Sequence, residues 1–346
     1  PHDGYDAATA QVDPAPGGAA LAAAFAVAAE AGLEAFGTWT SGAVETAIAT
    51  SRGVRAADRV TDAYMKVMCR DAHARTGQAA QAAVAAGAID GEAIARAAAA
   101  KVVADEPATL EPGAYPVVLD AEAVGGLLDM LAGLAFNGRA HAEGRGALEG
   151  LLGTQVAAES INLVDAPHHA RTWPRAFDFE GVPKADLTLI ADGVAQRVVH
   201  DTRSAAIAGD GAVSTGHALA PGGDAFGAVP TNLVLSGGDA PDVAALAQPI
   251  ERGLYVTRLW YLNVVHPRQT LLTGTTRDGT FLIEDGVITR PLRDVRFTDS
   301  VLRILSATEA LTSTTRLVSE AEYYGRRFAT GAVTPALRAA GFRITG

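Results

Sequence analysis

The sequence predicts an α+β fold, in which an N-terminal α/β portion with alanine-rich helices precedes a β-rich antiparallel C-terminal domain. Stretches 18–36 and 78–105 are rich in alanine, which loses little conformational entropy on entering a helix. Between them, Thr38–Thr50 and Val60–Arg70 alternate as two antiparallel strands would. From Leu187 onward, short β-like runs alternate with turn residues. We therefore expect domains over residues 1–150 and 151–346, divided within 144–176.

The middle of the chain predicts one strand and one helix. An apolar run, Tyr115–Leu119, indicates a strand, and Asp120 directly after it is suited to cap a helix that continues through Leu134. The glycine-rich passage 138–153 then interrupts the pattern. This arrangement predicts a strand that leads directly into a helix.

The C-terminal part predicts several short strands joined by tight turns. The runs are 187–190, 194–201, 232–235 and 254–265, and a turn is expected at Asp192-Gly193. Two further Asp-Gly pairs, 278–279 and 285–286, follow the runs 270–276 and 280–284. Since Asp-Gly between alternating runs is a strong hairpin signal, we expect a hairpin at each pair.

Composition and charge exclude some classes of protein. The 346 residues carry a net charge of −11 and no cluster of lysine or arginine, which argues against a nucleic-acid partner. Cys69 is the single cysteine, so no internal disulfide can form, and we expect a buried thiol and a cytoplasmic location. The apolar stretch 17–29 is shorter than the roughly 20 residues of a membrane-spanning helix. Because the sequence opens at Pro1 without methionine, we expect further residues upstream.

Common catalytic motifs for phosphate binding, zinc binding and serine nucleophiles do not occur in the sequence. A metal site would have to use His141, Glu143, His168 and His169; solvated loop histidines are the alternative, which we favour. Asp178 and Glu180 are spaced for acid/base work, but binding to backbone N–H groups is the simpler interpretation. The aromatic residues Tyr255, Trp260 and Tyr261 are interpreted as core of a strand rather than as a ligand platform.

An ordered set of segments resembles the TldD/PmbA family over roughly residues 110–345. Phe177–Pro183 is similar to the family's D-x-E-G-x-P element, and Ser214–His217 to its S-T-G-N loop, with histidine replacing asparagine. Further matching segments follow in the family's order: 230–233, 237–238, 253–257, 272–274 and 279–286. The first hundred residues match more weakly.

The resemblance implies a subunit without the family's zinc site. Catalytic TldD-type members carry HExxxH on a helix, where two histidines reach one zinc and the glutamate acts as general base. Here the comparable helix reads LLDMLAGL over 127–134, and the region 321–325 lacks the family's third ligand, a cysteine. The resemblance thus implies a TldE/PmbA-type chain with no catalytic residue and no metal of its own. It would form a heterodimer with a TldD-like subunit that holds the zinc.

A peptide is the substrate that the resemblance implies, and polar groups within apolar strands indicate where it would bind. Hydroxyl, amide and imidazole groups in such surroundings need hydrogen-bond partners, which a peptide backbone provides. The expected substrate-binding residues are Ser214, Thr215, Gly216, His217, Tyr261, Asn263, His266, Thr273 and Arg277. Two alternatives stay open: a self-sufficient metallohydrolase that uses the histidines above, and a non-enzymatic peptide-binding module.

Overall fold

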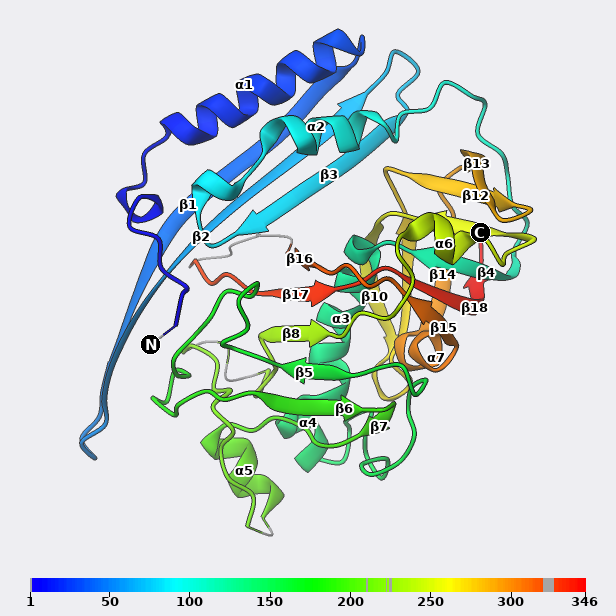
Figure 1. Cartoon of the computed structure of the whole chain (residues 1–346). Coiled ribbons are helices and arrows are strands. Elements are labelled where there is room, and N and C mark those ends of the chain that lie inside the picture. The colour runs from blue at the N-terminus through cyan, green and yellow to red at the C-terminus, as the bar shows by residue number, and fades with distance from the viewer. Residues whose placement is uncertain (1, 210, 222, 224–225, 320–326) are drawn as a thin grey trace.

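The computed structural model describes residues 2–209, 211–221, 223, 226–319 and 327–346, and within these it forms an α+β fold with three sheets (Figure 1). An N-terminal sheet of three strands carries two helices on one face. The rest of the chain folds into a nine-stranded and a six-stranded sheet. The predicted fold class is confirmed.

The N-terminal sheet contains β1 (Glu34–Ala49), β2 (Arg55–Arg70) and β3 (Thr76–Ala83), paired antiparallel in that order. Helices α1 (Ala15–Glu30) and α2 (Gly91–Ala99) cover one face (Figure 1). Side chains alternate along each strand. The helices therefore pack on Met65, Val67 and Cys69, while the neighbouring residues of β2 point to the opposite face. The predicted burial of the Cys69 thiol is confirmed.

The predicted helix over 78–105 is wrong in its first part, since β3 occupies residues 76–83 and α2 begins only at Gly91. Alanine favours helix only weakly, and tertiary packing overrides it. A Cβ atom at Gly77 would lie 2.2 Å from the carbonyl oxygen of Ala98. The glycine and alanine residues of β3 therefore allow β3 and α2 to pack closely against each other. The helix predicted over 18–36 also ends earlier, because β1 begins at Glu34.

The nine-stranded sheet begins with β10 at one edge and ends with β13 at the other. Its order is β10 (Leu259–His266), β11 (Leu271–Thr276), β14 (Arg296–Ser300), β18 (Leu337–Ile344), β4 (Gly113–Leu119), β9 (Arg252–Val256), β12 (Thr280–Glu284) and β13 (Val287–Pro291), and β15 (Thr308–Leu311) pairs with β18. The β4–β9 pair is parallel and the other pairs are antiparallel.

The six-stranded sheet has the order β16 (Arg316–Val318), β17 (Gly331–Thr334), β8 (Asn232–Leu235), β5 (Leu163–Asp165), β6 (Leu187–Ala191) and β7 (Val194–Ala195). Its β17–β8 pair is parallel, and the others are antiparallel. Short helices join the strands: η1 (Thr9–Gln11), η2 (Ala86–Ala88), α4 (Gly138–Ala142), α5 (Thr202–Ala208), α6 (Val243–Ala247), η3 (Pro267–Gln269) and α7 (Val301–Ser306).

Helix α3 (Ala121–Ala135) shares one core with both large sheets. Its Leu127, Leu128 and Leu131 belong to the same buried cluster as Leu163 of β5 and Leu254 of β9. Asp120 is the N-cap residue of α3, and its side chain accepts a hydrogen bond from the N–H of Ala121. Strand, cap and helix are thus confirmed at this point.

The Asp-Gly pairs behave differently from one another. Asp192-Gly193 and Asp285-Gly286 each have positive φ and close the hairpins β6–β7 and β12–β13, as predicted. At Asp278-Gly279 the predicted hairpin is wrong, because β11 pairs with β10 and β14, whereas β12 pairs with β9 and β13. This pair instead forms a corner between non-adjacent strands. The run 194–201 keeps only a two-residue strand, and 254–265 is divided into β9 and β10.

The division between sheets falls between β3 and β4, since β4 already pairs with β9 and β18. A domain boundary near residue 150 does not coincide with it, and that boundary stays a prediction. Among the described residues, the helices are too short or too polar to cross a membrane.

A pair of glycine substitutions tests the close packing of the two N-terminal helices. A Cβ atom at Gly91 would lie 2.2 Å from the carbonyl oxygen of Ala20 in α1, so Gly91→Ala should lower the free energy of unfolding by about 1–3 kcal/mol. Gly18→Ala in α1 meets no atom within 4 Å and should raise it by about 0.5–1 kcal/mol. Urea denaturation of both variants measures these effects. Equal effects from the two changes would contradict the packing argument.

Candidate functional site

Strand β10 is an exposed edge with several apolar side chains. Trp260, Tyr261, Val264 and Val265 are 41%, 66%, 42% and 53% exposed. One side of β10 pairs with β11, and no described strand pairs with its other side. An edge of this kind presents free N–H and C=O groups to another chain. The structure thus offers a site where an extended segment can add to the sheet.

The start of β10 is locally distorted. Tyr261 has a φ of 54°, which is unfavourable for a bulky residue, and the pairing register shifts between Trp260 and Asn263. Bulges of this kind redirect side chains next to functional sites. Here the Trp260 and Tyr261 rings lie 5.3 Å apart, and the guanidinium of Arg277 sits 4.3 Å from the Trp260 ring centre. The interpretation of Trp260 and Tyr261 as core residues is therefore wrong.

A pocket of about 290 Å³ lies between β10 and the uncovered face of the N-terminal sheet. We call it the β1–β10 pocket. It is lined by Phe36, Gly37, Thr38, Lys66, Met68, Gln78, Arg258, Trp260, Arg277 and Asp278. Of these, only Arg277 was expected from the sequence. The remaining ones come from five separate segments, and the alternation along β2 is the only sequence signal that sets Lys66 and Met68 on the face opposite the helices.

Asp278 holds the two walls of this pocket together. The residue is 4% exposed, and its carboxylate accepts hydrogen bonds from the Thr76 hydroxyl at 2.7 Å and from Arg258 Nη1 at 2.8 Å. Arg258 also lies 3.8 Å from Glu122 at the start of α3. Burial raises the pKa of Glu122, although neighbouring cations oppose this. The base of the pocket is therefore a buried cluster of charged groups.

The predicted residues Tyr261, Asn263, His266, Thr273 and Arg277 lie together on β10 and β11 or directly after them. Asn263 and Thr273 are opposite each other in the ladder. The Thr273 hydroxyl donates to the carbonyl of Phe297 at 2.9 Å, within the sheet, while Tyr261, Asn263 and His266 are exposed. The structure thus brings these five residues together at one sheet edge, and their contact with substrate stays a prediction.

The loop Ser214–His217 belongs to a different part of the fold. His217 is 2% exposed, and its Nε2 lies 2.9 Å from Asp165 Oδ2 on β5. The hydroxyls of Ser214 and Thr215 hydrogen-bond to the carbonyl of His200. Gly216 has a φ of 77°, and its carbonyl accepts from Lys184 at 3.2 Å. The loop is therefore tied to the six-stranded sheet, whereas the other predicted residues belong to the nine-stranded one.

Asp165, Lys184 and His217 form a buried ionic cluster. Lys184 Nζ lies 3.3 Å from Asp165 Oδ2, and the N–H groups of Thr231 and Asn232 donate to Oδ1. Burial alone would raise the pKa of Asp165, but Lys184 and His217 outweigh it and hold this pKa well below its ordinary value. Burial lowers the pKa of His217, opposed by Asp165. Every polar group here has a partner, which is typical of a structural cluster.

The four residues of the alternative metal site do not come together. Glu143 is engaged by Arg139 and Arg145, and His168 is exposed on a turn. Within the described ranges, no group of three or more His, Cys, Asp or Glu side chains could hold a metal ion. These four residues therefore do not form the alternative metal site within the described part of the chain. The region 321–325, where the third family ligand was sought, lies outside the described residues.

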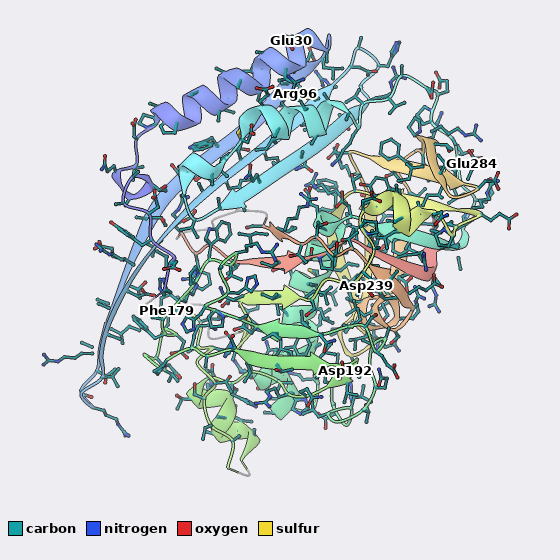
Figure 2. The ribbon with its side chains drawn as sticks, viewed as in Figure 1. Glu30, Arg96, Phe179, Asp192, Asp239 and Glu284 are labelled. Carbon is teal, nitrogen blue, oxygen red and sulfur yellow. The ribbon has the colours of Figure 1, made fainter. Side chains whose placement is uncertain are left out.

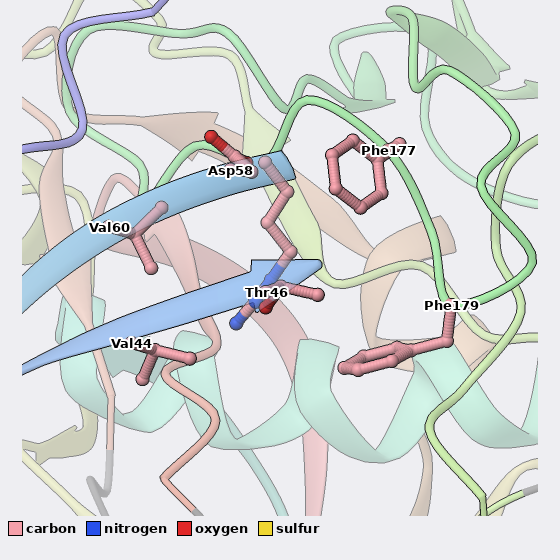
Figure 3. A pocket seen from close by; sticks show the side chains of 7 residues that line it. Val44, Thr46, Asp58, Val60, Phe177 and Phe179 are labelled. Atoms are coloured by element: carbon pink, nitrogen blue, oxygen red, sulfur yellow. The ribbon is translucent and has the colours of Figure 1, made fainter. Parts of the chain in front are cut away.

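The element that contains Asp178 packs against the long β1–β2 hairpin. Asp178 accepts hydrogen bonds from the N–H groups of Glu180, Val182 and Ala218, so backbone binding is confirmed. Glu180 accepts from Thr202. Figure 3 shows Phe177 and Phe179 beside Asp58 and Thr46 around a small cavity. Its volume of about 10 Å³ leaves room for roughly one water molecule.

Replacing the carboxylate of Asp165 should strongly destabilise the fold. Asp165→Asn would leave the buried ammonium of Lys184 without its counter-charge, so we expect a loss of about 3–5 kcal/mol in the free energy of unfolding. Denaturant titration measures this loss. The control is Asp239→Asn on the exposed surface (Figure 2), which should change stability by less than about 0.5 kcal/mol. Similar values for both variants would contradict the cluster's structural role.

The same cluster predicts a pH dependence. Since the pKa of Asp165 is lower in the folded than in the unfolded chain, where it is about 3.9, the stabilisation is complete above about pH 4. It is lost as the pH falls towards the folded-state pKa. The stability difference between the native chain and Asp165→Asn should thus narrow below about pH 4. A difference that stays constant into strong acid would count against this assignment.

The solved structures most useful for comparison share this fold. A proposed modulator of DNA gyrase from Thermotoga maritima superposes with a TM-score of 0.82 at 18% identity, covering 94% of this chain and 73% of that one. TldE from Thermococcus kodakarensis gives 0.80 at 22% identity, covering 95% and 73%. A proposed gyrase modulator from Bacteroides thetaiotaomicron gives 0.79 at 21%, covering 99% and 74%.

Sequence comparison gives the family. A protein named metalloprotease from Methanothermobacter thermautotrophicus is 27% identical over 212 residues, which is 59% of this chain and 44% of that protein. The chain thus matches less than half the length of this relative. The family model described as the PmbA/TldA metallopeptidase C-terminal domain matches residues 112–346. Because this match spans most of the chain, from β4 to the last strand, the chain belongs to the PmbA/TldD metallopeptidase family.

Proposed function

We propose that this chain is a non-catalytic, TldE-like subunit that pairs with a HExxxH-bearing, TldD-like zinc metallopeptidase and helps to form the cavity for its peptide substrate. The observation that carries this proposal is the exposed apolar edge of β10. A free edge strand with large apolar side chains favours aggregation unless another chain covers it. A partner subunit and an extended peptide are the two kinds of chain that such an edge accepts.

The position of β10 relative to α3 supports this proposal. Leu262 of β10 packs on α3, and its Cδ1 would lie 3.5 Å from a Cβ atom at Gly126. Helix α3 is the one that resembles the HExxxH helix of catalytic members. A peptide paired with β10 would therefore run beside the helix around which the family builds its chemistry.

The composition of α3 supports a non-catalytic role. Over 121–135 this helix contains no histidine, and its side chains Leu127, Leu128 and Leu131 are committed to the core. Asp129 is exposed and Met130 is partly buried. Neither side chain is an imidazole, so this helix lacks the two histidine ligands that a zinc site of this type uses. In our proposal the metal and the general base come from the partner, and this chain forms part of the wall of the peptide-binding cavity.

The first test is reconstitution with a HExxxH-bearing relative encoded by the same genome. We expect the two chains to co-purify, peptide hydrolysis to require both, and elemental analysis to find stoichiometric zinc in the complex but not in the isolated chain. A broad interface of more than roughly 1,200 Å² is the size that stable pairs bury.

Two outcomes would contradict the proposal. Near-equimolar zinc and peptidase activity in the isolated chain would make it a catalytic subunit. If the chain stays a monodisperse monomer that binds peptide but does not bind such a partner at micromolar concentration, it is a peptide-binding module instead.

A charge placed on the β10 edge should weaken its contacts while the fold stays intact. Val265 is 53% exposed, so Val265→Lys should change stability by less than about 0.5 kcal/mol but reduce partner or peptide affinity at least about tenfold. The matched control is Val287→Lys on β13, the opposite edge of the same sheet, where Val287 is 59% exposed. Equal loss of affinity in both variants would show that β10 is not the contact edge.

A further inference from the structure

Gln78 is a buried amide without a hydrogen-bond partner. It is 2% exposed and lines the β1–β10 pocket, yet neither its Oε1 nor its Nε2 hydrogen-bonds to any residue in the described part of the chain. A buried polar group left unpaired is costly, so its presence in a folded chain calls for an explanation. The two amide atoms therefore indicate a missing partner inside the pocket, one that both donates and accepts.

The register of the N-terminal sheet explains how the pocket wall is built. Phe36, Met68 and Gln78 are direct cross-strand neighbours on β1, β2 and β3, and Thr38 and Lys66 form the next row. Residues two apart on a strand point to the same face. Both rows thus share the face that α1 and α2 leave uncovered, and they place one amide and one ammonium beside two apolar side chains.

The pocket carries an excess of positive charge in an acidic protein. Three cations, Lys66, Arg258 and Arg277, line it together with the single carboxylate of Asp278. Asp278 is already bound to Thr76 and Arg258, and Arg277 lies 3.9 Å away from it. Among the described residues, Lys66 has no carboxylate within 4 Å. An anionic ligand would complement Lys66 and the partly exposed Arg277.

We infer that the β1–β10 pocket binds the C-terminal residue of a peptide, an assignment that rests on the proposed peptide-binding function. The terminal carboxylate lies at Lys66 and Arg277, and the last peptide group pairs with the Gln78 amide through its own N–H and C=O. An apolar terminal side chain packs on Phe36, Met68 and Trp260. A volume of about 290 Å³ is near the lower limit of ligand pockets, roughly 300 Å³, and fits so small an occupant.

The Gln78 amide distinguishes this ligand from other anions. A peptide group offers one donor and one acceptor, which match Oε1 and Nε2. A phosphate monoester dianion offers acceptors only, so it would pair with Lys66 and leave Oε1 unsatisfied. A peptide that ends in the pocket would therefore use both the charge and the amide.

The test compares two labelled hexapeptides that end in phenylalanine, one with a free carboxylate and one amidated. Binding to the purified chain is followed by fluorescence anisotropy. We expect the free acid to bind about tenfold or more tightly than the amide, as a charge-assisted hydrogen bond provides. Lys66→Met should remove this preference by weakening only the free acid.

Gln78→Met gives a second and different signature. Since it removes an unpaired buried amide and keeps the volume, the melting temperature should stay equal or rise, while both peptides bind about tenfold more weakly. The control Arg252→Met removes an exposed cation on β9, away from the pocket, and should leave both affinities unchanged.

Several results would overturn the assignment. Equal affinity for acid and amide, unaffected by Lys66→Met, would show that peptide binds elsewhere, and the proposed subunit role would stand. Displacement of the peptide by inorganic phosphate, beyond the effect of chloride at equal ionic strength, would make the pocket a phosphate site. Absence of binding by either peptide would remove the inference, and the co-purification test would then decide the proposed function on its own.

Discussion

The arrangement of the candidate site depends on one buried carboxylate. Asp278 stands at the corner between β11 and β12, where its hydrogen bonds to Thr76 and Arg258 connect the N-terminal sheet to the nine-stranded sheet. The backbone adds a further link from the Gln78 N–H to the Asp278 carbonyl at 3.4 Å. Because a buried charge that loses its partners is strongly destabilising, this corner has little freedom to shift. It therefore fixes how far β3 lies from β10.

The charges around this corner are balanced as a group rather than in isolated pairs. Lys101 donates to the Gln78 carbonyl at 2.5 Å, and burial lowers its pKa while Glu122 and Asp120 oppose the shift. Burial and the nearby Asp278 carboxylate raise the pKa of Asp294 to about 6. Such a cluster orients its members firmly but leaves Gln78 without a side-chain partner. The junction thus has paired charged groups where it joins the two sheets, and an amide without a hydrogen-bond partner where it lines the pocket.

The sequence predicted the local features well and the long-range ones poorly. The Asp120 cap, the Asp285-Gly286 turn and the buried Cys69 depend on residues close in sequence, and all three are confirmed. The strand at 76–83 was missed because its alanines reflect close packing against α2, which local propensity does not report. Trp260 was assigned to the core because periodicity does not distinguish an edge strand from a central one. The pocket could not be predicted, since residues 36, 66, 78, 258 and 277 meet only through the sheet packing.

Helix α3 contains no histidine, so metal binding by this helix does not explain why the chain has this fold. Helix α3 remains as core between two sheets, so its fold-forming role survives independently of any metal. The edge of β10 and the pocket beside it are different, because an exposed Trp260, a strained Tyr261 and an unpaired Gln78 each cost stability and contribute nothing to the core. Features that a fold retains against its own stability are best explained by what they bind. In this chain Trp260 and Tyr261 lie on the edge strand β10, and Gln78 lines the adjoining β1–β10 pocket from β3. This is the region where we propose that a partner and its peptide meet the chain.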